Sequence, residues 1–224
     1  GGREPQAVVV DAGGRVAALL NEPTPEQIFD LADRLYRATS PAVIQSLAPV
    51  LLLERVADTD LCRALIDYWQ ARDKSANTID AARGNVASAD LKRRQDVQVD
   101  DPALLARLRG VLMTRIAPLI QQAFHTTINV FEAPVVGCYD RSSGGWFRRH
   151  RDNPTPLTAN RQFAVSLNLN GEDEYEGGEV RFPEFGRALY RPVAGGALVF
   201  SCSLLHEVVP IVRGRRLGLF TFMS

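Results

Sequence analysis

The chain has 224 residues, of which 46% are hydrophobic and 23% charged, a composition typical of an ordinary globular protein and not of a disordered or fibrous one. Its 26 Lys and Arg balance its 26 Asp and Glu, so bulk charge provides no attraction to nucleic acid or to an anionic membrane, and we expect neither as a partner. Three cysteines without paired spacing argue against a disulfide framework and favour a reducing, cytoplasmic location.

The first unit, residues 1–38, is predicted to be a hairpin followed by a helix. Two apolar runs, 8–10 and 16–20, flank a glycine-containing turn at 12–14, and Thr24 with Gln27 forms a capping box at the helix start. The pattern resembles the closing third of a thioredoxin-like domain. Because no cysteine precedes it, the resemblance carries over no redox chemistry. We interpret 1–38 as a hairpin-helix extension.

The second unit is predicted over residues 49–224, after a proline-bounded loop at 39–49. Apolar residues at helical spacing predict one helix from 58 or 59 to about 72 and one continuous helix from 100 or 101 to about 124. The stretch 74–96 is polar and has few apolar residues. We interpret its run 92–94, Lys-Arg-Arg, as solvated, with a nucleic-acid patch as the alternative.

Beyond His125, which we interpret as a cap at the helix end, the sequence changes to short β-favouring runs separated by Gly, Pro and acidic turns. The runs cover 128–131, 135–139, 163–169, 179–182, 197–200, 207–212 and 217–222. Spacings this short leave no room for helices between strands. They predict an α+β fold with an antiparallel jelly-roll core over about 126–224 and supporting N-terminal helices.

Two of the three histidines fall into one pattern with an aspartate. His150 and Asp152 are two residues apart in a segment expected to be extended, so both side chains can reach one ion. His206 follows 54 residues after Asp152 and begins another β-favouring run, which returns to the same interior in a rolled sheet. Two imidazoles and one carboxylate leave three positions of an octahedral metal open, which suits a catalytic non-haem iron(II).

Arg216 begins the last apolar run, after a turn predicted at Gly214. Iron(II) with one carboxylate carries a local charge of +1, and a dicarboxylate such as 2-oxoglutarate brings −2, so one further cation neutralises the buried assembly. A guanidinium can bind a carboxylate with two parallel hydrogen bonds. Arg216 is our candidate for that cation, and Arg213 and Arg215 are interpreted as solvated.

From about Val135 to Ser224 the sequence resembles the prolyl-4-hydroxylase-like branch of the 2-oxoglutarate and Fe(II)-dependent dioxygenases. The resemblance rests on elements in the family's order: Tyr139, Gly144-Gly145, Phe147, His150 and Asp152, then Asn168-Leu169-Asn170, Glu176-Gly177-Gly178, Gly195 to Phe200, and His206 to Arg216.

The resemblance implies a double-stranded β-helix in which His150, Asp152 and His206 bind iron. It implies that Arg216 holds the far carboxylate of 2-oxoglutarate and that Tyr139 hydrogen-bonds this cosubstrate, with Asn168 standing where relatives often have a second contact. The implied activity is hydroxylation of a peptidyl residue, proline being one candidate, or of a small molecule. Dioxygen and 2-oxoglutarate are consumed, succinate and CO2 are released, and ascorbate is a candidate reductant.

Two further arginines are candidate substrate contacts. Strict alternation along residues 148–151 places Arg148 on the metal face and the arginines at 149 and 151 away from it. Arg161 is a candidate for the cavity entrance, with a structural salt bridge as the alternative. Two other functions use the same residues: a zinc hydrolase on a cupin-like scaffold, which has no need of Arg216, and a non-catalytic β-sandwich binding module.

Overall fold

The computed structural model describes residues 6–11, 16–38, 44, 46–76, 78–81, 84–87 and 90–224. The turn predicted at 12–14 and most of the loop predicted at 39–49 lie outside these residues. The chain divides into two compact units, Gly1–Gln45 and Ser46–Ser224, each of which is described by itself. In the described residues no helix has the length and apolar character needed to cross a membrane.

The N-terminal unit is an antiparallel hairpin of β1 (Gln6–Val10) and β2 (Val16–Asn21) followed by α1 (Pro25–Ala38). The predicted capping box is confirmed: the backbone amide of Gln27 donates to Thr24 Oγ1 at 3.3 Å, and that of Thr24 donates to Gln27 Oε1 at 3.0 Å. Val8 and Leu19, which face each other across the hairpin, are both more than half exposed.

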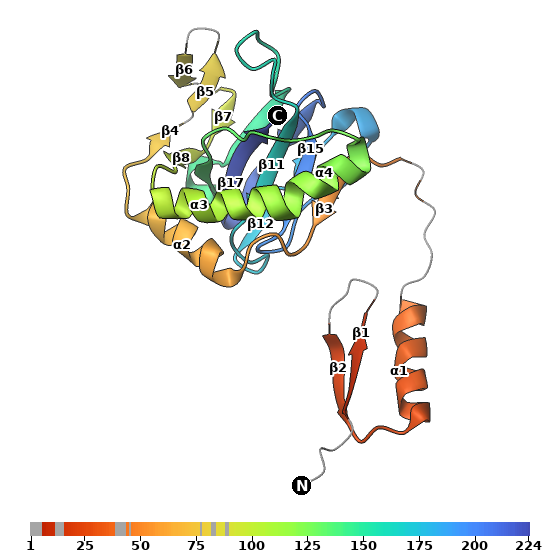
Figure 1. Ribbon diagram of the computed structural model, residues 1–224. Coiled ribbons are helices and arrows are strands. Elements are labelled where there is room, and N and C mark those ends of the chain that lie inside the picture. Colours follow the sequence, from red (N-terminus) through yellow and green to blue (C-terminus); the bar gives the residue numbers. More distant parts are fainter. Residues whose placement is uncertain are drawn as a thin grey trace. The chain divides into compact units, whose positions relative to one another are not determined.

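Two antiparallel sheets form the framework of the C-terminal unit (Figure 1). The major sheet consists, in spatial order, of β3 (Val50–Leu53), β15 (Ala197–Ser201), β11 (Phe163–Asn168), β17 (Ile211–Met223), β9 (Val135–Asp140), β8 (Gln95–Gln98) and β4 (Ser75–Ala76), with β12 (Tyr175–Gly177) paired to β17. The minor sheet consists of β14 (Leu189–Tyr190), β13 (Val180–Arg181), β16 (His206–Val208), β10 (Trp146–His150) and β7 (Lys92–Arg93). A separate hairpin pairs β5 (Thr78–Ala81) with β6 (Gly84–Ala87), and two short 3₁₀ turns cover Arg141–Ser143 and Pro183–Phe185.

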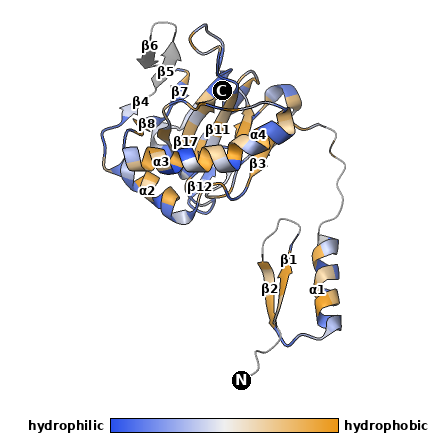
Figure 2. Ribbon diagram, viewed as in Figure 1, coloured by the Kyte–Doolittle hydropathy of each residue, from blue (hydrophilic) through white to orange (hydrophobic). Residues whose placement is uncertain are grey.

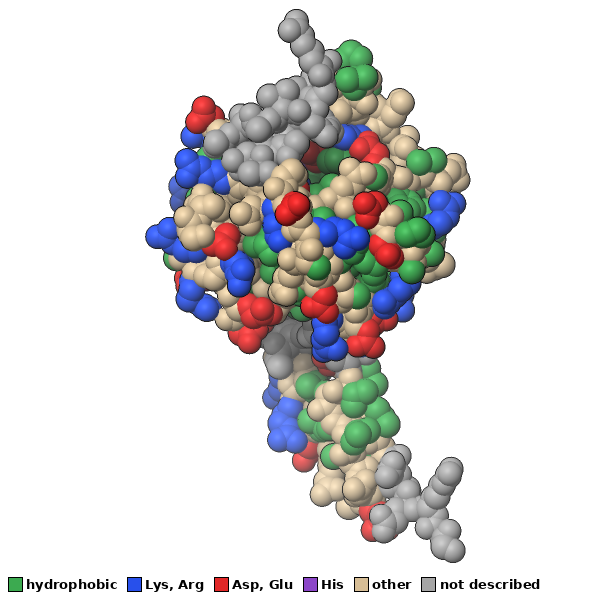
Figure 3. Space-filling model, turned by 90° about the vertical axis from the view of Figure 1, so that its left-hand side faces the viewer, with side chains coloured by type: hydrophobic (Ala, Val, Ile, Leu, Met, Phe, Trp, Pro, Cys, Tyr) green, Lys and Arg blue, Asp and Glu red, His purple; other side chains and the backbone are tan. Residues whose placement is uncertain are grey.

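Helices cover the outer face of the major sheet. They are α2 (Thr59–Gln70), α3 (Pro102–Val111) and α4 (Ala117–Phe124), and α3 and α4 run across the strands in Figure 1. Their apolar faces, including Leu65, Leu108 and Ile120, pack against side chains such as Leu167 and Leu219 of the sheet. Figure 2 shows the corresponding hydrophobic colouring on the strands and on these helices. Figure 3 shows that basic and acidic side chains are interspersed over the face in view.

The inner face of the major sheet points towards the minor sheet. Because side chains alternate along a strand, Ala164, Ser166 and Asn168 of β11 point inward while Val165 and Leu167 point to the helices. A second core, between the two sheets, contains Tyr139, Leu198, Phe200, Phe182 and Val208 among others. The site lies within this inner layer.

The helix predicted from 100 or 101 to 124 is interrupted by a π-helical turn at Leu112–Ile116. The amide of Ala117 bonds to the carbonyl of Leu112, five residues earlier. Pro118 has no N–H to donate to Thr114 and its ring crowds the preceding turn, so regular α-helical pairing cannot continue there. His125 does end the helix, in a left-handed conformation (φ 52°), with its backbone amide donating to Gln121.

Three predictions for the strands were wrong. The run 92–94 is not a solvated loop, since Lys92 and Arg93 form β7. The polar stretch 74–96 around it also contains β4, β5 and β6, and β8 begins at its end. Residues 128–131 form no strand and contribute only one bridge, from Phe131 to Met223. No turn at Gly214 separates 207–212 from 217–222: β17 runs continuously through Gly214, whose φ of 68° lets the backbone pass close to Glu174, just before β12, where a Cβ would clash.

Candidate metal centre and cosubstrate pocket

The two histidines of the His-x-Asp…His pattern face each other across the minor sheet. His150 of β10 pairs directly with His206 of β16, and Phe147 pairs with Val208. Two residues of β10 therefore lie opposite a single residue of β16, which is a β-bulge. Because of this bulge, Phe147 and His150 point to the same face, and their rings stack with centroids 3.6 Å apart.

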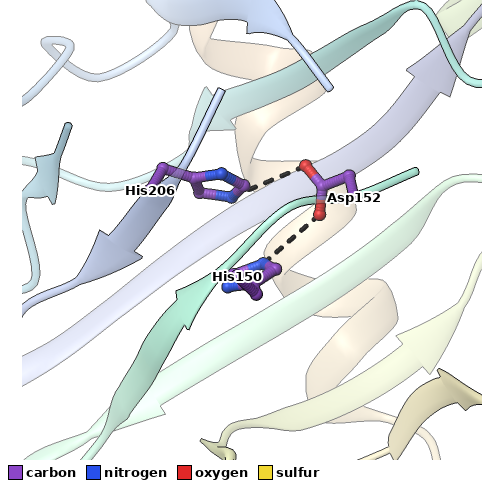
Figure 4. Close-up of side chains that lie close together, drawn as sticks. All are labelled: His150, Asp152 and His206. Atoms are coloured by element: carbon purple, nitrogen blue, oxygen red, sulfur yellow. Dashed lines mark ion pairs between the residues drawn. The ribbon is translucent and has the colours of Figure 1, made fainter. Parts of the chain in front are cut away.

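Asp152 completes the cluster from the loop after β10, where its backbone amide donates to the carbonyl of Cys202 at 2.9 Å. One ligand atom from each of His150, Asp152 and His206 lies within 4.8 Å of the others. Asp152 Oδ1 is 3.3 Å from His150 Nε2, and Oδ2 is 3.5 Å from His206 Nε2 (Figure 4). The structure thus brings together the three side chains that the sequence pattern singled out.

Backbone contacts fix both imidazole rings. Nδ1 of His150 lies 2.7 Å from the carbonyl oxygen of Arg148, and Nδ1 of His206 lies 3.1 Å from that of Leu204. A carbonyl oxygen can only accept, so Nδ1 carries the proton in each ring. In a neutral ring, Nε2 then carries a free electron pair on the side of Asp152. Metal-binding histidines show this arrangement.

The charges of the cluster fit a cation. Burial lowers the pKa of His206 to about 4 against the opposing effect of Asp152, so this ring is neutral at pH 7. Burial raises the pKa of Asp152, but His206, His150 and Arg161 together hold it below its ordinary value, so its carboxylate is ionised. Two electron pairs and an anionic carboxylate converge on one point, which a divalent metal would satisfy.

Arg216 lies at the other end of the inner layer, in β17, and is 1% exposed. Its guanidinium donates to the carbonyl of Gly178 at 2.7 Å, to Ser166 Oγ at 2.9 Å and to Asn168 Oδ1 at 3.2 Å. All three acceptors are neutral, and among the described residues no carboxylate forms an ion pair with Arg216. A buried cation held only by neutral groups fits the binding of an anionic ligand.

Asn168 is placed behind Arg216. Its amide nitrogen lies within hydrogen-bond distance of the carbonyls of Asn170 and Pro192 and the hydroxyl of Tyr175. Its oxygen accepts from Arg216, so both ends of the side chain are engaged within the protein. In this arrangement Asn168 orients Arg216.

A cavity of about 450 Å³ connects the metal cluster to the inner face of the major sheet. The three cluster residues line it together with Tyr139, Phe147, Phe200 and Phe220. Arg216 is next to this wall: its guanidinium carbon lies 5.8 and 6.0 Å from the centroids of the Tyr139 and Phe220 rings.

The two candidate substrate arginines differ in position. Arg161 lines the cavity, binds Glu132 through two contacts of 2.6 and 2.7 Å, and donates to the backbone carbonyl of Asp152 at 3.3 Å. Arg148 is exposed and lies over the ring of Trp146, 5.0 Å from its centroid. The alternation predicted for 148–151 was wrong because the bulge changes it, and Arg151 lines the cavity instead of Arg148.

Sequence reasoning missed a charged cluster in the cavity wall. Lys92 and Arg94, interpreted as solvated, are 3% and 9% exposed and both bind Asp96 of β8. Lys92 belongs to β7, which pairs with β10, so the strand turns its side chain inward. Neither the spacing nor the composition of the run signals this burial. Gly137 on the paired strand is consistent with the burial, because a Cβ there would lie 2.6 Å from Arg94 Nε.

Comparisons with known proteins agree with this geometry. Residues 135–224 match the model of the 2OG-Fe(II) oxygenase superfamily, where 2OG is 2-oxoglutarate. The matched segment contains the metal cluster, Tyr139, Asn168 and Arg216. Residues 135–224 are a 2OG-Fe(II) oxygenase domain.

The related sequences and similar solved structures include hydroxylases. The chain is 27% identical over 178 residues to a PKHD-type hydroxylase of Teredinibacter turnerae, covering 75% of this chain and 76% of that one. A prolyl-4-hydroxylase of Pseudomonas putida superposes with a TM-score of 0.58 at 22% identity, over 79% of this chain and 92% of that chain. A prolyl hydroxylase of Trichoplax adhaerens, solved with a hypoxia-inducible-factor peptide, gives 0.64 at 18% identity, over 78% and 83%.

These similarities confirm the predicted fold, an α+β domain with a double-stranded β-helix core, and the prolyl-4-hydroxylase-like character of the oxygenase. They make the chain an enzyme that uses iron(II), 2-oxoglutarate and dioxygen, with hydroxylation as its reaction class. Neither the zinc hydrolase nor the non-catalytic module is favoured.

Proposed function

We propose that this oxygenase hydroxylates a residue within a peptide or protein, with His150, Asp152 and His206 as the iron ligands. Arg216 is proposed to bind the far carboxylate of 2-oxoglutarate. The observation that carries the proposal is the pairing, in one inner layer, of a three-residue metal cluster with a fully buried arginine that has only neutral partners.

Bound iron(II) and 2-oxoglutarate supply the chemistry: dioxygen is reduced, 2-oxoglutarate leaves as succinate and CO2, and one oxygen atom enters the substrate. The protein's own residues orient the ligand side chains and enclose the site. Carbonyls behind His150 and His206 keep Nε2 of each ring available to the metal. Phe147 and Phe200 pack against these rings, so the ligands sit in an apolar wall that limits access of water.

Neighbouring side chains fix Arg216 and, through it, the far carboxylate of the proposed cosubstrate. Ser166 and Asn168 accept hydrogen bonds from Arg216 and thereby fix the plane of its guanidinium. Tyr139 lines the cavity with its ring beside Arg216, and its hydroxyl is proposed to donate to a bound carboxylate. A net +1 at the metal cluster and +1 at Arg216 balance the −2 of 2-oxoglutarate.

A peptidyl substrate is supported by two features. The fold neighbours include a prolyl hydroxylase solved with a peptide. The cavity wall also carries polar and charged groups at its exposed side, with Glu132 about half exposed beside Arg161, which suits a chain passing over the opening. A prolyl residue is the first candidate target, and Arg161 is the candidate contact to the chain around it.

The test is a screen of proline-containing peptides, with free amino acids and other small metabolites in parallel. Succinate formation from 2-oxoglutarate and a mass gain of one oxygen in the substrate are measured together. We expect a peptide to stimulate succinate formation in the wild type and to be unmodified by the Asp152→Ala variant. Modification of a free metabolite alone would contradict the peptidyl assignment, and an Asp152→Ala variant with full activity would contradict the metal ligand set.

A further inference from the structure

A charged cluster that the proposed chemistry does not use lies behind Tyr139. Asp96 of β8 accepts from Lys92 Nζ at 2.8 Å and from Arg94 at 2.5 Å (Nε) and 3.0 Å (Nη2). The guanidinium of Arg94 is thus gripped by two parallel contacts, the geometry that fixes an arginine most firmly. All three side chains are buried and line the same cavity as the metal cluster.

Two further features fix the plane of this guanidinium. Its carbon lies 4.1 Å from the centroid of the Phe220 ring, a stacking distance. On the opposite strand, Gly137 leaves the space that Arg94 and Asp96 fill, since a Cβ there would lie 2.6 Å from Arg94 Nε and 2.8 Å from Asp96 Oδ1. Arg94 is therefore a built-in part of the wall and not a mobile surface side chain.

From this fixed position Arg94 Nη1 donates to the hydroxyl of Tyr139 at 3.4 Å. Tyr139 is 1% exposed, and its phenol has a single proton to donate. Arginine has no acceptor, so the phenol oxygen must be the acceptor in this contact, and its own proton has to point elsewhere. The direction left open is the cavity, which Tyr139 lines.

We propose that Arg94 is a positioning residue for 2-oxoglutarate binding: clamped by Asp96, it holds Tyr139 with its hydroxyl proton directed at a carboxylate of the cosubstrate. The inference rests on the proposed function, in which Tyr139 contacts 2-oxoglutarate. It assigns cosubstrate affinity in part to the segment 92–96, which lies outside the family-matched region 135–224.

The test is a double-mutant cycle on 2-oxoglutarate binding, measured by calorimetry on protein loaded with Mn(II) in place of iron, so that no turnover occurs. Loss of one hydrogen bond predicts that Tyr139→Phe weakens binding about three- to tenfold, and that Arg94→Gln weakens it by a similar factor. Because Arg94 acts through the phenol, the double variant is expected to bind no more weakly than Tyr139→Phe alone.

Two variants guard against a general loss of structure. Arg94→Lys keeps a cation beside Asp96 but has no fork to reach Tyr139, so it is expected to weaken binding like Arg94→Gln. Arg93→Gln, at the exposed neighbouring position, is expected to bind 2-oxoglutarate like the wild type. Mn(II) affinity is expected to stay unchanged in all of them.

The inference is overturned if Arg94→Gln and Arg94→Lys bind 2-oxoglutarate like the wild type, if the two substitutions multiply in the double variant, or if Mn(II) binding falls in parallel. A failure of the proposed function has a different signature: the wild type does not bind 2-oxoglutarate, or Arg216→Met binds it as well as the wild type does.

Discussion

The two sheets of the oxygenase unit hold their functional residues in different ways. The minor sheet has strands of two to five residues and presents His150 and His206 through a bulge, ring stacking and two backbone carbonyls. The major sheet presents Arg216 from a 13-residue strand and engages the guanidinium through Gly178, Ser166 and Asn168. The comparison suggests that metal and cosubstrate affinity are separable properties, carried by different sheets.

The largest expected effect is on metal binding. Substitution His206→Ala removes a ligand, so Mn(II) or Fe(II) affinity should fall by more than the ~10–100-fold that loss of a ligand's hydrogen-bond partner costs. His125→Asn, at a helix end outside the cavity, is the matched control and should bind metal like the wild type. Equal metal affinity of His206→Ala and the wild type, measured by calorimetry, would remove His206 from the ligand set.

The second-largest effect is expected on the affinity for 2-oxoglutarate. Arg216→Met removes the guanidinium proposed to pair with the far carboxylate of 2-oxoglutarate. Loss of one partner of a buried charge pair typically costs ~3–5 kcal/mol, so the dissociation constant of 2-oxoglutarate should rise about 100- to 5000-fold while metal affinity is kept. The neighbouring Arg215→Met, whose side chain is largely exposed, is the control and should change neither. If Arg216→Met lost metal and cosubstrate together, the two sheets would not be separable.

A substitution at Glu132 tests whether metal affinity depends on the support of the loop that follows β10. Glu132 binds Arg161, and Arg161 donates to the backbone carbonyl of Asp152, a proposed metal ligand. Glu132→Gln loosens this support, so we expect metal affinity to fall about tenfold, with the affinity for 2-oxoglutarate at saturating metal unchanged. Asp60→Asn, in an exposed pair on α2, should have no effect. Unaltered metal affinity in Glu132→Gln would show that Asp152 needs no such support.

The smallest effect concerns stability at acidic pH. Burial raises the pKa of Asp96, but Arg94 and Lys92 hold it below its ordinary value of about 4. A depressed folded-state pKa contributes stability above the unfolded pKa, and that stability is lost as the pH falls through the folded-state value. Denaturant unfolding of the wild type should therefore lose free energy below about pH 4. The loss should be shallower in Asp96→Asn, and parallel curves for the two proteins would contradict this linkage.

The metal cluster could be predicted because its chemistry leaves a local trace. Histidine is scarce, and the pair His150 and Asp152 lies two residues apart at the end of a strand. The capping box at Thr24 was also readable, since it depends on residues close in sequence.

What could not be predicted depends on partners distant in sequence. Lys92 and Arg94 look like solvent-exposed charges until Asp96 and the space above Gly137 are known. The continuity of β17 through Gly214 depends on the approach of Glu174, and the shared face of Phe147 and His150 depends on a register shift between two strands. Propensity and alternation describe a strand alone, and these features are set by what lies beside it.

The bulge in β10 has a consequence for how this segment can vary. Phe147 and His150 are turned to the same side although two residues lie between them, and the side chains of Arg148 and Arg149 project outside the cavity lining. Deleting one of these two arginines would remove the bulge and leave Phe147 and the imidazole two positions apart, which regular alternation also places on one face. Exchanging both arginines for other residues would leave it in place.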